Sequence, residues 1–212
     1  MKSKIFNYGG VVAAAILIAF GIGAVVMGIN GRDTVRSSIN KEAIVGTPDM
    51  TPTAIAAEAK KAGLKNVDIP STSVAGHKID TGGEAKTFAQ YMRIHALEAT
   101  GGQVYSQMGR FLTKDGKPTN DETAAAVDSK TGKPVENGAR NLWVTETALS
   151  TALNTSYFAE NVANFAIVMG VALLLTGIGF LVLTLGLVRV PFSRTKEADR
   201  AAPAATAVPV AS

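Results

Sequence analysis

Metal coordination is the chemistry that the two histidines of this chain, His77 and His95, could perform. Glu98 follows His95 by three residues, so on a helix the two side chains would share a face and could supply two ligands. A complete site needs three or four ligands, and only the distant His77 or another carboxylate could add one. We therefore predict no metal site and favour a surface histidine paired with Glu98; His77, His95 and Glu98 are the candidates if a site exists.

Other catalytic constellations are not recognisable. The chain has no cysteine, which excludes disulfides, thiol catalysis and cysteine-ligated metals. The two Gly-Lys-Pro triplets at residues 116–118 and 132–134 lack the spacing and the Ser/Thr of a phosphate-binding loop, so we interpret them as turns. We find no nucleophile elbow, no paired-carboxylate spacing and no metalloprotease helix. We predict no catalytic residues and no cofactor.

Two long uncharged stretches, residues 5–31 and 161–188, dominate the sequence. The chain of 212 residues is 47% hydrophobic and only 18% charged, with a mean hydropathy of +0.19. Each stretch exceeds the roughly 20 residues that a helix needs to cross a bilayer. We predict transmembrane helices at residues 10–30 and 161–188. The alternatives are two buried helices of a globular core and, for the first stretch, a signal peptide, although its apolar run is long and no Ala-x-Ala-like site follows.

The distribution of charge predicts the orientation of the chain. The net charge is +4, but the segment between the two stretches holds equal numbers of acidic and basic residues, so the excess lies in the short tails. Short basic tails stay cytoplasmic, whereas long loops are translocated largely regardless of charge. We predict a multi-pass protein of the plasma (inner) membrane with cytoplasmic tails at 1–9 and 189–212, the latter disordered, an extracytoplasmic domain at 31–160 and no nucleic-acid partner.

The predicted fold is mainly all-α. We expect short helices at residues 52–62, 84–99 and 104–112, one short strand near 74–79, and a mobile loop at 113–139. A continuous helix is predicted from about residue 140 to 188, with a length of roughly 70 Å at 1.5 Å per residue. It would form an extracytoplasmic stalk before it enters the membrane, and Trp143 would pack into the small external domain.

Small residues recur at helical spacing in both predicted spans. They suit close helix–helix contact, either between the two spans or with another subunit. Neither span contains an ionisable residue, which argues against an ion pathway or a transporter core. Tyr157 and Phe158 lie where interfacial aromatic residues are expected. The predicted packing residues are Ala15, Ala19, Gly23, Ala166, Gly170 and Gly177.

Three segments, residues 91–102, 132–134 and above all 141–160 leading into Gly170, resemble a group of two-pass membrane proteins of actinobacteria. Many of these proteins carry the label "aromatic ring-opening dioxygenase". The resemblance covers about residues 5–190 and implies a plasma-membrane protein with an external domain, without established catalytic residues. The label finds no support in the residues, because a non-haem iron centre needs two histidines and a carboxylate that converge on the metal.

We therefore expect a non-enzymatic integral membrane protein. It would be an accessory or assembly subunit of a larger cell-envelope or membrane complex, in contact with membrane lipids and with other membrane or envelope protein subunits. Two alternatives remain: a metal-dependent, dioxygenase-like membrane enzyme, and an envelope protein that binds a lipid or another small ligand.

Overall fold

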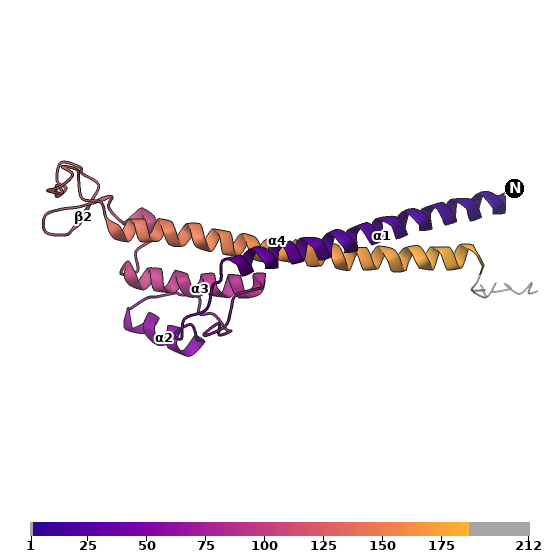
Figure 1. The fold of residues 1–212 in the computed structure, drawn as a ribbon, viewed down its shortest axis with the longest axis horizontal. Coiled ribbons are helices and arrows are strands. Elements are labelled where there is room, and N and C mark those ends of the chain that lie inside the picture. Colours follow the sequence, from indigo (N-terminus) through magenta and orange to yellow (C-terminus); the bar gives the residue numbers. More distant parts are fainter. Residues whose placement is uncertain (1, 187–212) are drawn as a thin grey trace, which may run out of the picture.

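Two long helices run antiparallel along most of the molecule (Figure 1). The computed structural model describes residues 2–186, and side chains from residue 8 onward. Helix α1 spans Lys2–Lys41 and helix α4 spans Gly138–Thr184. The predicted mainly helical fold is confirmed, and both helices are long and apolar enough to cross a membrane. The predicted disordered tail at 189–212 lies outside the described residues.

Both long helices extend beyond the uncharged stretches. Helix α1 continues past residue 31 to Lys41 as a charged and polar helix. Helix α4 begins at Gly138, where the side chain of Asn137 accepts a hydrogen bond from the backbone N–H of Ala139 and caps the first turn. The predicted continuous helix from residue 140 is confirmed as far as Thr184. The part of α4 before the uncharged stretch is therefore a helical stalk.

Helices α1 and α4 contact each other through small residues spaced by seven. A Cβ atom on Gly170 would lie 2.7 Å from Val25 Cγ2 and 2.8 Å from the carbonyl oxygen of Gly21. A Cβ atom on Gly177 would lie 3.0 Å from the carbonyl oxygen of Ala14. Seven-residue spacing keeps one seam facing the partner helix, and small side chains let the two backbones approach. The buried seam residues are Ala14, Gly21 and Gly28 on α1 and Ala163, Gly170 and Gly177 on α4.

The distal domain, residues 42–137, lies at the end of the molecule away from the N-terminus and packs against the stalk part of α4 (Figure 1). It contains α2 (Pro52–Lys61) and α3 (Gly82–Ala99), close to the predicted bounds. Thr51 and Thr81 cap these helices through their side chains. The core is small, and Ile39 of α1 and Leu153 of α4 join it. Its largest fully buried side chains are Tyr91, Ile55, Ile79, Ile94 and Val74.

The predicted helix at 104–112 is wrong. A single 3-10 turn, η1 (Tyr105–Gln107), is followed by strand β1 (Phe111–Leu112), which pairs with β2 (Pro118–Thr119) in an antiparallel hairpin. Gly109 permits this close approach, since a Cβ atom there would lie 2.5 Å from the backbone nitrogen of Thr119. Backbone hydrogen bonds to β2 and to Val135 thus replace the hydrogen bonds within one turn that a helix would need.

The remaining predictions concern two loop segments. The predicted strand at 74–79 is absent from the described chain, where this segment makes only isolated bridges, Val45 with Lys78 and Gly46 with Ala75. The segment 113–139 is largely exposed, and backbone hydrogen bonds connect it to β1. Its mobility stays a prediction.

Candidate functional site

Helix α4 carries only two charged side chains between residues 141 and 184, Glu146 and Glu160. Both are buried, with 5% and 6% of their surface exposed. Their separation of two heptads places them on the same face of the helix, the face that packs on the rest of the protein. A buried carboxylate destabilises the fold unless it is paired and hydrogen-bonded. The ion-pair partners of these two residues lie on α1 and α3, so they form the contact between the long helices and the distal domain.

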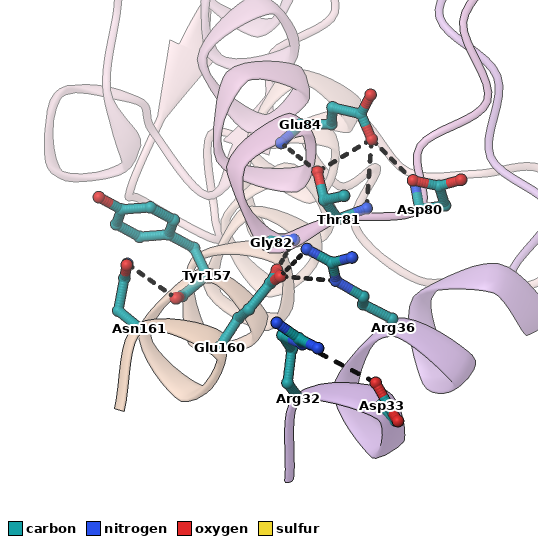
Figure 2. Close-up of polar contacts among 10 residues, drawn as sticks. All are labelled: Arg32, Asp33, Arg36, Asp80, Thr81, Gly82, Glu84, Tyr157, Glu160 and Asn161. Carbon is teal, nitrogen blue, oxygen red and sulfur yellow. Dashed lines mark hydrogen bonds and ion pairs between the residues drawn. The ribbon is translucent and has the colours of Figure 1, made fainter. Parts of the chain in front are cut away.

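Glu160 connects three elements (Figure 2). Its Oε1 atom lies 2.6 Å from Nη2 of Arg36 on α1 and accepts a hydrogen bond of 2.7 Å from Nε of the same arginine. Its Oε2 atom accepts a hydrogen bond from the backbone N–H of Gly82, the first residue of α3. The carboxylate therefore pairs with a cation and also lies at the positive end of a helix, an environment that favours a negative charge.

Gly82 must be glycine for α3 to reach Glu160. A Cβ atom at this position would lie 2.8 Å from the Cα atom of Tyr157 and 2.8 Å from Oε2 of Glu160. Thr81 and Glu84 form a capping box at the same helix start. Burial alone would raise the pKa of the Glu84 carboxyl, but hydrogen bonds from Asp80 and Thr81 outweigh it and hold the pKa below its ordinary value.

Glu146 makes a second connection, closer to the distal end of α4. Its carboxylate lies 3.1 Å from Nη1 of Arg93 on α3 and accepts a hydrogen bond of 2.6 Å from the hydroxyl of Ser150. The guanidinium of Arg93 lies 4.6 Å from the centroid of the Trp143 ring. Trp143 is buried against Ala96 and Met108, which confirms that it packs into the distal domain.

The exposed residues of α4 between 141 and 158 form a surface that we call the outward face of α4. Because Glu146 and Glu160 point to the opposite side, the outward face has no charged side chain. The hydroxyls of Thr145, Thr151 and Thr155 donate to carbonyl oxygens one turn earlier in the helix, so these three threonines present mainly their methyl groups. The exposed apolar residues are Leu142, Val144, Leu149 and Phe158, at 44%, 51%, 50% and 67% exposure.

The predicted packing residues fall into two groups. Gly170 and Gly177 contact α1, and Ala166 is half-buried. On α1, however, Ala15 and Ala19 are exposed and a Cβ atom on Gly23 would meet nothing within 4 Å. The predicted ridge on α1 therefore does not contact α4. The residues that face α4 are Ala14, Gly21 and Gly28, which are spaced by seven residues.

The predicted interfacial aromatic residues have different surroundings. The Tyr157 ring lies 4.6 Å from Nζ of Lys86 on α3, so it contacts the distal domain. Phe158 is 67% exposed. Their role at a membrane surface stays a prediction.

His95 lies between two carboxylates that come from other parts of the chain. Its Nε2 atom is 3.5 Å from Oδ2 of Asp49, and its Nδ1 atom is 3.5 Å from Oε2 of Glu58. His77 and Glu98 are exposed, and the potential metal ligands that the described residues bring together are Asp49, Glu58 and His95. The predicted pairing of His95 with Glu98 is therefore wrong.

The sequence analysis missed the two buried carboxylates of α4, although their spacing is visible in the sequence. Glu146 and Glu160 interrupt a long uncharged helix at a two-heptad spacing, which indicates two buried carboxylates on one face. No comparable signal links His95 with Asp49 and Glu58, because they come from three separate segments. Comparisons of the chain with known protein families, curated proteins and solved structures find no match.

Proposed function

We propose that this chain is a non-enzymatic integral membrane protein that serves as an accessory or assembly subunit of a larger membrane or cell-envelope complex. Helices α1 and α4 cross the plasma membrane, with both termini cytoplasmic and the distal domain extracytoplasmic. Two helices of sufficient length and apolarity support the membrane location, and the basic tails support the orientation. The resemblance to two-pass actinobacterial membrane proteins agrees with this proposal.

The observation that carries the proposal is the uncharged outward face of α4. A helix that faces water normally bears charged and polar residues on its exposed side. The stalk part of α4 lies outside the predicted span, so lipid tails do not account for its composition. The outward face is uncharged and consists of threonines, alanines, two asparagines and the apolar residues Leu142, Val144, Leu149 and Phe158. Such a surface suits contact with a helix of another membrane protein, where small residues permit close approach and Thr and Asn side chains can form hydrogen bonds.

The buried charges of α4 support a structural role for the opposite face. Glu146 pairs with Arg93, and Glu160 pairs with Arg36 and the start of α3. These contacts hold the distal domain against α4 in a defined orientation. The protein would thus present the outward face of α4 as a preformed surface to a neighbouring subunit.

The absence of cysteine permits a direct test with single cysteines. Leu149→Cys places a thiol on the outward face, and Ala57→Cys places one on an exposed position of α2. In native membranes a photoreactive thiol reagent should cross-link Leu149→Cys to a distinct membrane protein and leave Ala57→Cys without that product. Equal labelling at both sites, or no product at Leu149→Cys, contradicts the proposal.

A charge on the outward face should release the partner. Leu149→Asp is expected to lower the mass of the complex on native gels after extraction in mild detergent, because an aspartate would be buried without a cation at the contact. Ala57→Asp serves as the matched control and should leave the complex intact. A complex of unchanged mass in Leu149→Asp would exclude this face as the contact.

A further inference from the structure

We propose that Asp49, Glu58 and His95 form a binding site for a divalent transition-metal ion of the zinc type. The site would connect the loop before α2, helix α2 and helix α3. The site includes no residue of α4 and none of the partners of Glu146 and Glu160, so it is independent of the proposed function.

The fold brings the three ligands together at the edge of the small core. Asp49 lies directly before α2, Glu58 is on α2, and His95 is on α3. Ile55 and Ala59 are buried on α2 beside Glu58, and Ile94 and Ala96 are buried on α3 beside His95. The packing of α2 on α3 therefore places the ligands, which are all half-buried with 30% to 41% of each side chain exposed.

The distances suit coordination better than hydrogen bonding. Each nitrogen of His95 is 3.5 Å from a carboxylate oxygen, and the ligand atoms of the three residues lie within 4.8 Å of one another. A charge-assisted N–H···O bond would bring these atoms to about 2.7–2.9 Å. Zinc with bonds of about 2.0–2.1 Å in a tetrahedron separates its ligand atoms by about 3.3–3.4 Å, so ligand atoms within 4.8 Å of one another need only a small side-chain movement to bind one ion.

A single ion binds one nitrogen of the imidazole. Asp49 approaches Nε2 and Glu58 approaches Nδ1, so an ion at one nitrogen engages the nearer carboxylate directly. The other carboxylate would reach the ion by rotation of its side chain, which is partly exposed. One nitrogen and two oxygens leave the fourth position of a tetrahedron for water.

The electrostatics of the cluster favour a cation. Within the described part of the chain, neither Asp49 nor Glu58 makes an ion pair with a lysine or an arginine. With a neutral imidazole the three residues carry two negative charges.

The mixed ligand set indicates which ions should bind. An imidazole nitrogen with carboxylates suits zinc and neighbouring first-row metals, whereas magnesium and calcium prefer sites made of oxygen alone. A bound ion would link three segments of a small domain that has no disulfide. Metals perform this stabilising role in small domains with limited cores.

The test uses the full-length protein in detergent micelles, prepared without a histidine tag and treated with a chelator. Thermal unfolding is measured with and without zinc chloride or magnesium chloride, and zinc affinity is measured by calorimetry. Zinc should raise the unfolding temperature and magnesium should not. His95→Gln and Glu58→Gln should each weaken zinc binding by about 100-fold or more and abolish the shift.

The chain offers matched controls at the same residue types. His77→Gln removes the other imidazole and Glu98→Gln removes the carboxylate next to His95 in sequence; both residues are exposed, and both variants should bind zinc like the unmodified protein. If His95→Gln does not fold, Asp49→Asn replaces it. The proposal is overturned if zinc produces no shift, or if the shift persists in His95→Gln. A lower stability of metal-free His95→Gln without any zinc binding would identify an ion-pair cluster instead.

Discussion

Glu160 of α4 and Arg36 of α1 make two contacts through one carboxylate oxygen, at 2.6 and 2.7 Å. The second oxygen of Glu160 accepts the first N–H of α3. Figure 2 shows Glu160 between Arg36 and Gly82. The nearest seam residues are Gly28 and Ala163, so the pair lies between the seam and the distal domain. It therefore couples the packing of the two long helices to the position of the distal domain.

Substitution of Arg36 and substitution of Glu160 should lower the free energy of unfolding by different amounts. Arg36→Ala leaves Glu160 buried without a cation and should lower the free energy of unfolding by about 2 kcal/mol, less than for a fully buried pair because Arg36 is 44% exposed. Glu160→Gln removes the charge but keeps an acceptor for Gly82, so about 1 kcal/mol is expected. Unfolding in mixed micelles with increasing dodecyl sulfate measures both. Asp33→Ala, at an exposed position, is the control, and equal losses in the two variants would contradict this account.

The seam between α1 and α4 should not tolerate larger residues. Gly170→Val introduces atoms where Val25 and the Gly21 carbonyl already lie, and should cost about 1–3 kcal/mol through forced separation of the helices. Gly179→Val is the matched control on the same helix, since a Cβ atom there meets nothing within 4 Å. The unfolding temperature of both variants in detergent checks the prediction. A similar loss in Gly179→Val would mean that the seam is not the cause.

Trp143 is the only tryptophan and reports on the contact between α3 and α4. Glu146→Ala removes the partner of Arg93 and the acceptor for Ser150. We expect a loss of about 2 kcal/mol and a shift of the fluorescence emission to longer wavelength as water reaches the indole. Thr145→Ala, which alters an exposed hydroxyl bonded only to its own helix, should leave the spectrum unchanged. An unshifted spectrum in Glu146→Ala would exclude the proposed role of this carboxylate.

The capping box of α3 predicts a pH dependence. The folded-state pKa of Glu84 lies below its ordinary value of 4.5. Its contribution to stability is therefore present above pH 4.5 and is lost as the pH falls through the lowered pKa. Glu84→Gln should cost about 0.5 kcal/mol at neutral pH, and the difference from the unmodified protein should vanish under acidic conditions. Denaturant titrations across this pH range measure it, with Glu98→Gln as control. A constant difference at all pH values would contradict the assignment.

Local sequence was sufficient to predict α2, α3, α4 and the apolar part of α1, but not the polar continuation of α1 to Lys41. The uncharged stretches, the Thr51-Pro52 start and the residues around Gly101 define helical segments through composition and capping, which act within a few residues. The segment at 104–112 was predicted wrongly because its backbone pairs with β2 and with residues beyond the hairpin. Such pairing depends on residues that lie far along the chain.

Long-range packing selected the contact faces and the ligands. Helix α1 carries two ridges of small residues, and their composition alone does not distinguish the ridge through Ala15 and Ala19 from the seam through Ala14 and Gly21. The position of α4 makes that choice. His95 likewise pairs with Asp49 and Glu58, not with its sequence neighbour Glu98, because the packing of α2 on α3 brings three separate segments to one place. Residue types and spacing thus establish which helices form, whereas the contacts between elements determine which side chains meet.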